Sequence, residues 1–156
     1  MQVIADTSPL QYLILIGQTA LLPRLFEKIA IPSIVLDEML NRGSPNLVRN
    51  WAHAPPTWLT VADPPLNADP TLEHLDAGEA AVILLALDCK ASLVLMDDRA
   101  GASAARSHGL TVTGTVGVLD RAASRGMTDL PAAVARLRET NFRYRPALLN
   151  ELLARH

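Results

Sequence analysis

The chain has 156 residues, of which 49% are hydrophobic and only 4% are aromatic. This length fits one domain with enough apolar material for a core, so we expect a single domain over residues 1–156. The scarce aromatics argue against a nucleotide-stacking aromatic platform, and a formal net charge of -2 argues against a uniformly basic surface for polyanions.

Short apolar runs alternate with helical patterns along the chain. Strands are predicted over residues 2–5, 28–31, 92–96 and 110–113, with a short extended piece at 58–61 inside the proline-rich and mostly irregular stretch 54–70. Helices are predicted over residues 8–17, 33–40, 76–88, 98–108 and 146–153. Strands that alternate with helices pair in parallel and are covered on both faces, which predicts a three-layer α/β/α fold with a central parallel sheet of four or five strands.

Two helix starts have recognisable end signals. Ser8 is predicted to be an N-cap before a first-turn proline, Pro9. Asp76 is predicted to cap the helix that runs to about Asp88. The last helix, 146–153, is amphipathic, and we expect its leucines to dock on the core or on a second subunit.

Acidic residues follow two of the predicted strands directly. Asp6 comes after the first, and Asp97 and Asp98 come after the strand at 92–96. Ligands of open parallel sheets bind beyond the carboxyl ends of the strands, so adjacent strands would bring these carboxylates to one edge. An alternative is that Asp98 only caps the next helix.

Two further acids lie on predicted helices. Glu38 falls inside the apolar arc of its helix, where a carboxylate must be paired, protonated or bound to a cation, although a place at the edge of the buried face is an alternative. Glu79 is aligned with Val82, Ile83 and Ala86, but it also stands three residues after Asp76, as in a capping box. Both interpretations of Glu79 remain open at this point.

Four carboxylates in one place would repel one another unless cations were bound between them. Ligation by oxygen alone favours magnesium or manganese over zinc, and the chain has no His/Cys set with zinc spacing. The acids therefore predict a Mg²⁺ or Mn²⁺ site.

Charge is unevenly distributed along the sequence. Up to Asp98 there are five Lys and Arg against twelve Asp and Glu, a formal charge of -7; from Arg99 onward there are nine against four, a charge of +5. The protein can therefore have an acidic cluster that binds cations and, elsewhere on its surface, arginines that bind phosphates. Four arginines of segment 130–145 are candidates to flank such a groove: Arg136, Arg138, Arg143 and Arg145. The alternative is that they lie on ordinary solvated helix faces.

Four ordered blocks of sequence resemble the PIN-domain family over nearly the whole chain. They read VIADTSPLQYLILIG, LLPRLFEKIAIPSIVLDEML, LDAGEAAVILLALD and LVLMDDRAGASAARSHGLTVTGTVGVLDRAASRG. The resemblance is greatest to a toxin-like branch that begins with Asp-Thr-Ser-Pro-Leu and carries paired aspartates after a later strand. It implies a PIN-like α/β/α fold.

The resemblance also implies the site residues. It assigns the catalytic and metal-binding acids to Asp6, Glu38, Glu79 and Asp98, with Asp97 as a candidate additional ligand. Many members have aspartate at the third position, so Glu79 departs from that pattern by one methylene. Thr7 and Ser8 match a small hydroxyl position beside the first acid, where they orient Asp6 or cap the helix.

The function implied by the resemblance is that of a Mg²⁺- or Mn²⁺-dependent endoribonuclease, the toxin of a type II toxin–antitoxin pair. Expected partners are an RNA substrate, a small cognate antitoxin protein and a second copy of the chain in a homodimer. The alternative is a PIN-fold protein-binding module with weak or no catalysis. A single cysteine, Cys89, no secretory leader and a longest apolar run of residues 80–87 favour a cytoplasmic protein outside the membrane.

Overall fold

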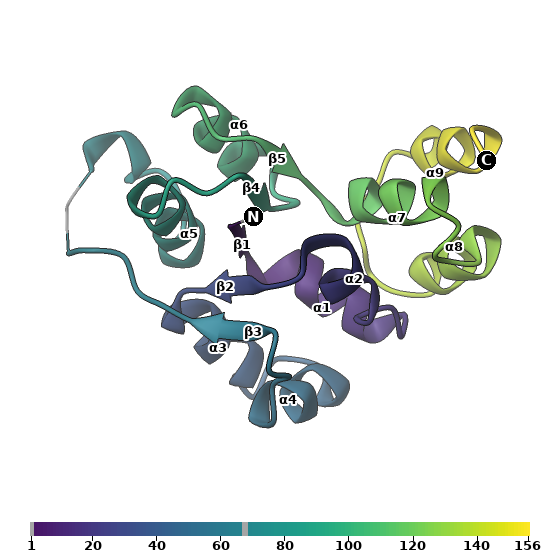
Figure 1. Ribbon diagram of the computed structural model, residues 1–156, viewed down its shortest axis with the longest axis horizontal. Coiled ribbons are helices and arrows are strands. Elements are labelled where there is room, and N and C mark those ends of the chain that lie inside the picture. Colours follow the sequence, from purple (N-terminus) through teal and green to yellow (C-terminus); the bar gives the residue numbers. More distant parts are fainter. Residues whose placement is uncertain (1, 67–68) are drawn as a thin grey trace.

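Five parallel strands form one sheet in the computed structural model, which describes residues 2–66 and 69–156 (Figure 1). The strands are β1 Val3–Ala5, β2 Ile29–Ile31, β3 Leu59–Val61, β4 Leu93–Leu95 and β5 Val112–Thr113. Their order is β3-β2-β1-β4-β5, and every residue of β1, β2 and β4 is buried, as parallel strands covered on both faces require. The predicted three-layer α/β/α fold is confirmed, and the extended piece expected at 58–61 supplies strand β3.

Helices cover both faces of the sheet. They are α1 Thr7–Leu15, α2 Leu21–Phe26, α3 Ser33–Leu40, α4 Asn46–His53, α5 Ala77–Asp88, α6 Arg99–Ser107, α7 Thr115–Ser124, α8 Leu130–Arg138 and α9 Pro146–Ala154, with a short 3-10 turn at Pro70–Leu72. Helices α5 and α6 lie on one side, whereas α1 to α4 lie on the other and α7 to α9 extend it (Figure 1). In the described ranges, no helix is long and apolar enough to cross a membrane.

The helix boundaries confirm some end signals and correct one. Helices α3, α5 and α6 begin and end close to the predicted residues, and the side chain of Asp76 caps α5 as expected. Ser8 is not an N-cap, however, because α1 already begins at Thr7 and the Ser8 hydroxyl donates to Asp97. Asp6 occupies the N-cap position, but its side chain makes no cap hydrogen bond. Residues 67 and 68 of the predicted irregular stretch lie outside the described residues.

The strand order reverses between β1 and β4, and this fixes where the site lies. β1 leads through β2 to β3 on one side, whereas β4 and β5 continue on the other. Ala5 is in register with Leu95, and the Asp6 N–H donates to the Leu95 carbonyl at 2.9 Å. Helices diverge from such a reversal and leave a crevice beyond the carboxyl ends of the two strands. Asp6, Asp97 and Asp98 follow these two strands directly.

Helix α9 closes the C-terminal side of the fold. It packs against α7 and α8, with Leu149 and Leu152 completely buried and Leu148 and Leu153 partly buried. The expectation that this amphipathic helix docks on the core is thus confirmed within one chain.

We expect Leu149→Ala to lower the free energy of unfolding by about 2–5 kcal/mol, because it leaves a cavity among α7, α8 and α9. Leu47→Ala is the control, since Leu47 is 60% exposed and its truncation should change stability by less than about 0.5 kcal/mol. Urea unfolding monitored by circular dichroism measures both. Equal stability of the two variants would show that α9 is not docked as described.

Candidate active site

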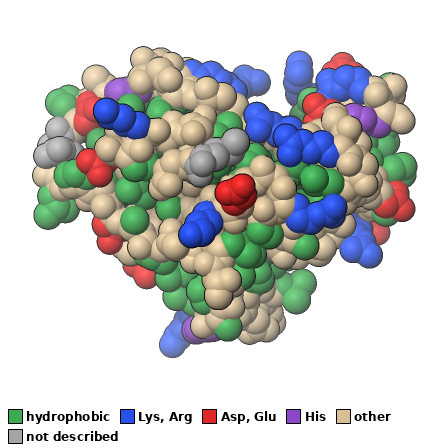
Figure 2. Space-filling view, viewed as in Figure 1, with side chains coloured by type: hydrophobic (Ala, Val, Ile, Leu, Met, Phe, Trp, Pro, Cys, Tyr) green, Lys and Arg blue, Asp and Glu red, His purple; other side chains and the backbone are tan. Residues whose placement is uncertain are grey.

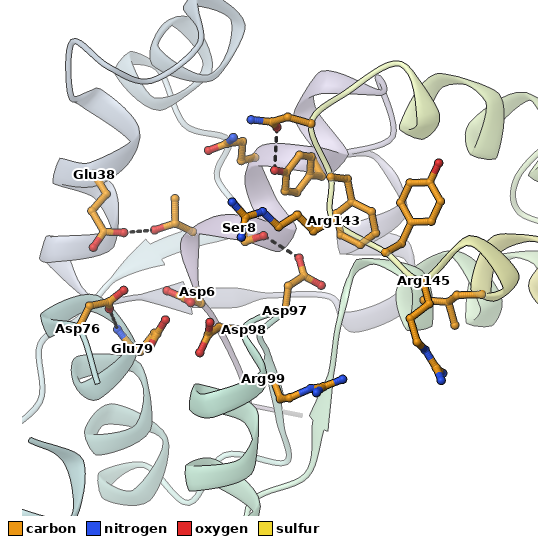
Figure 3. Close-up of a pocket in the computed structure, with 17 residues that line it drawn as sticks. Asp6, Ser8, Glu38, Asp76, Glu79, Asp97, Asp98, Arg99, Arg143 and Arg145 are labelled. Carbon is orange, nitrogen blue, oxygen red and sulfur yellow. Dashed lines mark hydrogen bonds between the residues drawn. The ribbon is translucent and has the colours of Figure 1, made fainter. Parts of the chain in front are cut away.

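A groove of about 950 Å³ lies beyond the carboxyl ends of β1 and β4. Six carboxylic acids line it, and they come from β1, α3, α5 and the end of β4: Asp6, Glu38, Asp76, Glu79, Asp97 and Asp98. All the sequence-predicted acids therefore line one groove, where Asp6, Glu79 and Asp98 lie close together and Asp97 is directed toward Ser8 (Figure 3). Asp76 is an addition, because its sequence position indicated only a helix cap.

Asp6 is the most buried of these acids, with 7% of its surface exposed. Burial is the main reason why the pKa of its carboxyl rises from 3.8 to about 7; a hydrogen bond from the Thr7 backbone N–H opposes this shift, and the charges of Glu38, Asp76 and Asp97 add to it. An ionised Asp6 is therefore unfavourable near neutral pH unless positive charge comes close to it.

Glu79 lies beside Asp6 at the start of α5. Burial and, after it, the charges of Asp76, Asp98 and Asp6 raise the pKa of Glu79 from 4.5 to about 8. Asp76 uses Oδ1 to accept the Glu79 backbone N–H at 2.8 Å, which is the predicted cap. The same i, i+3 spacing places both side chains at the helix end that faces the groove, and this signal would have identified Asp76 as a groove residue (Figure 3).

Glu38 lies in the groove, and of the two positions left open by the sequence it has the one at the edge of the buried face. Only Val35 and Met39 of α3 are buried, and Glu38 stands at the edge of that face with its side chain exposed. The Thr7 hydroxyl donates a hydrogen bond to its carboxylate. A Cβ atom on Gly78 would collide with this carboxylate, so the Glu38 side chain could keep its present position only if residue 78 has no side chain.

Asp97 and Asp98 have different roles although they are neighbours. Asp97 accepts three hydrogen bonds, from the Ser8 hydroxyl at 2.8 Å and from the Thr115 N–H and hydroxyl, both at 2.7 Å. It therefore joins the end of β4 to α1 and α7. Asp98 uses Oδ2 to accept the Gly101 N–H at 2.8 Å, so it does cap α6. Capping occupies one of its two oxygens, and a capping role is compatible with a ligand role.

The donor chemistry of the groove fits a hard divalent cation. Carboxylate oxygens are the ligands that Mg²⁺ and Mn²⁺ prefer, and a cation between Asp6 and Glu79 would relieve the unfavourable charge that raises their pKa values. Within residues 2–66 and 69–156, however, no three His, Cys, Asp or Glu side chains are already arranged to hold an ion. Several acids are held by hydroxyl or helix N–H groups instead, so binding would require side chains to shift.

The arginines of segment 130–145 divide into two pairs. Arg136 donates to the Ile16 carbonyl at 3.1 Å and Arg138 to the Asn150 side chain at 2.8 Å, so these two support the fold. Arg143 and Arg145 line the groove, together with Arg99 (Figure 3). Lys and Arg side chains gather over the C-terminal helices in Figure 2. The groove therefore has an acidic and a basic end.

The fold and this groove define an α/β/α protein with an acidic site at the reversal point of a parallel sheet. A family model described as a PIN domain matches residues 2–156, and the chain belongs to the PIN-domain family. PIN domains are generally nucleases, act on nucleic acids and typically bind divalent metals. A comparison with curated proteins finds no match.

Stability should fall as the pH rises, because the unfolded chain releases the protons of Asp6 and Glu79 near pH 4 whereas the folded chain keeps them until about pH 7 and 8. In chelator, we expect wild-type protein to lose about 1–2 kcal/mol from the Asp6 proton alone between pH 5.5 and 8.5. Asp6→Asn should reduce this loss, and millimolar Mg²⁺ should restore part of it to the wild type. Thermal melts measure the effect; an identical decline in Asp6→Asn would contradict it.

Asp97→Ala should lower the free energy of unfolding by about 1–3 kcal/mol, because it leaves Thr115 and Ser8 without their acceptor. Asp98→Asn should lower the free energy of unfolding by less than about 1 kcal/mol, because an asparagine side chain also caps a helix. Equilibrium urea unfolding in chelator compares the two. A larger loss in Asp98→Asn would refute this division of roles.

Proposed function

We propose that residues 1–156 form one PIN-like domain that acts as a metal-dependent endoribonuclease and is the toxin of a toxin–antitoxin pair. The convergence of Asp6, Glu79 and Asp98 from three different elements in one groove is the observation that carries the proposal. Membership of a family that consists generally of nucleases supports it.

Asp6, Glu79 and Asp98 would hold Mg²⁺ or Mn²⁺, with Glu38 facing them from α3. When bound, such an ion lowers the pKa of a water molecule and neutralises charge on the phosphoryl oxygens. Asp97 acts as a positioning residue, because its hydrogen bonds to Ser8 and Thr115 fix the end of β4, from which Asp98 extends.

Hydrolysis in this groove requires no protein nucleophile. Water adds to phosphorus, the bond to the 3′ oxygen breaks, and the products are a 5′-phosphate and a 3′-hydroxyl. The basic end, with Arg99, Arg143 and Arg145, binds the phosphates of the strand on either side of the cut.

The toxin role and the partners follow from the sequence resemblance. It implies a homodimer and a small antitoxin protein that lies over the groove. Silencing by such a partner would work by covering the carboxylates of Asp6, Glu79 and Asp98 and so excluding both RNA and the ion.

A second candidate is a protein-binding module that keeps the acids without catalysis. One observation favours it: among the described residues, no three potential ligands are already placed around an ion position. Activity separates the two functions, because a binding module cleaves no RNA with or without metal.

Purified protein should cleave single-stranded RNA with Mg²⁺ or Mn²⁺ and lose this activity in chelator. Asp6→Asn and Asp98→Asn should reduce the rate by about 100-fold or more, the scale of removing one group that stabilises transition-state charge. Denaturing gels of labelled RNA measure the rate, and Asp37→Asn, on the exposed side of α3, is the matched control.

Expression should also arrest growth in a bacterial host, and the same two substitutions should relieve the arrest. Equal toxicity of the wild type and both variants, or cleavage that persists in chelator, would contradict the proposed nuclease function.

A further inference from the structure

The segment 141–145 between α8 and α9 runs along the groove, and all five of its residues line it. Its exposure alternates: Asn141, Arg143 and Arg145 are exposed, whereas Phe142 and Tyr144 are partly buried. This period of two is that of an extended chain, which presents successive side chains to opposite sides. The segment therefore offers aromatic rings and guanidinium groups in alternation beside the acidic site.

The aromatic rings of this segment form a cluster with Tyr12 of α1. The ring centroids of Tyr12 and Phe142 are 5.0 Å apart at an interplanar angle of 75°, and those of Phe142 and Tyr144 are 6.1 Å apart at 18°. The Tyr12 hydroxyl donates to Asn141 at 2.8 Å, which fixes the start of the segment. Three of the six aromatic residues of the chain thus line one groove, so the low aromatic content did not exclude an aromatic surface.

Tyr144 is not needed to join the segment to α1, although its partly buried ring also packs against the hydrophobic core. The Tyr12–Phe142 contact and the Asn141 hydrogen bond already join it to α1. Tyr144 stacks only on Phe142 among the aromatic rings of the described residues, and it lies between two exposed arginines. Its side chain lines the groove and is only partly buried, so part of the ring is accessible from the groove.

Arg143 and Arg145 are available to bind anions. In the part of the chain that the structure describes, neither forms an ion pair, whereas Arg155 pairs with Asp120. Their counterpart Arg138 is engaged with Asn150 outside the groove. Guanidinium groups recognise phosphate by paired hydrogen bonds, and aromatic rings bind unpaired bases by stacking.

We propose that Tyr144, Arg143 and Arg145 form a nucleotide-binding subsite, in which an unpaired base stacks on the aromatic cluster and the flanking phosphates bind the two arginines. The subsite lies in the same groove as the carboxylates, so the base that it holds determines which phosphodiester bond reaches them. This inference rests on the proposed function, because it requires RNA to enter the groove.

Binding rather than cleavage tests the subsite. The full chain carrying Asp6→Asn is titrated against two fluorescein-labelled probes, a single-stranded oligouridylate and an abasic ribose-phosphate strand of equal length, and fluorescence anisotropy gives the Kd. Tyr144→Leu should weaken binding of the oligouridylate by about tenfold, the scale of losing one base stack, and leave the abasic strand unaffected. Tyr144→Phe should retain binding of both probes, which excludes a folding defect at this position.

The arginines should behave differently from the tyrosine. The double variant Arg143→Gln, Arg145→Gln should weaken binding of both probes and reduce the slope of log Kd against log salt by about 0.7 for each phosphate that an arginine no longer neutralises. Arg138→Gln is the matched control and should leave both affinities unchanged.

Three results would contradict the subsite. The protein binds neither probe, Tyr144→Leu does not lower the affinity for the oligouridylate, or Tyr144→Leu lowers the affinity for both probes equally. Failure of the nuclease proposal is recognised separately. If the wild type cleaves no RNA with metal but the probes bind as expected, the proposed subsite is supported and the proposed nuclease activity is wrong.

Discussion

Electrostatic repulsion among carboxylates at the reversal point of the sheet is the constraint on which the site depends. Parallel pairing of β1 with β4 places Asp6 beside the residues that follow Leu95, and the packing of α5 adds Glu79. Burial of Asp6 removes the water that would otherwise screen its charge, which is why its pKa rises to about 7. The fold therefore concentrates unfavourable charge at one point, and a cation or protons must compensate it.

Hydrogen bonds assign different tasks to acids that look alike in the sequence. Asp97 accepts hydrogen bonds from three donors and Asp76 accepts one from a helix N–H, whereas Asp6 makes no side-chain cap although it occupies an N-cap position. The acids with few competing partners are those available for a ligand. Because hydroxyl groups such as those of Ser8 and Thr115 satisfy Asp97, nearby polar residues determine which carboxylates remain free.

The sequence was sufficient to predict the parallel sheet and the location of the acids, because apolar runs end directly at Asp6 and Asp97 and period-3.6 patterns mark α3 and α5. It did not indicate helices α2, α4 and α7; α2 has only six residues with a proline among them, and α4 follows directly after a proline. It left two positions open for Glu38, inside the buried arc or at its edge, and the structure has the second, since an arc drawn on one helix does not show which neighbours cover it. The aromatic cluster of Tyr12, Phe142 and Tyr144 joins the two ends of the chain, and no local pattern reveals such a contact.

The close approach of Gly78 to Glu38 joins the two outer layers of the fold over the edge of the sheet. Helix α3 belongs to one layer and α5 to the other (Figure 1), and the Glu38 carboxylate occupies the space that a side chain on Gly78 would take. Any macromolecule that docks on the outer surface of either helix and tilts it would widen or narrow the mouth of the groove. A change in the spacing of these two helices would thus alter the acidic site without any contact to the acids themselves.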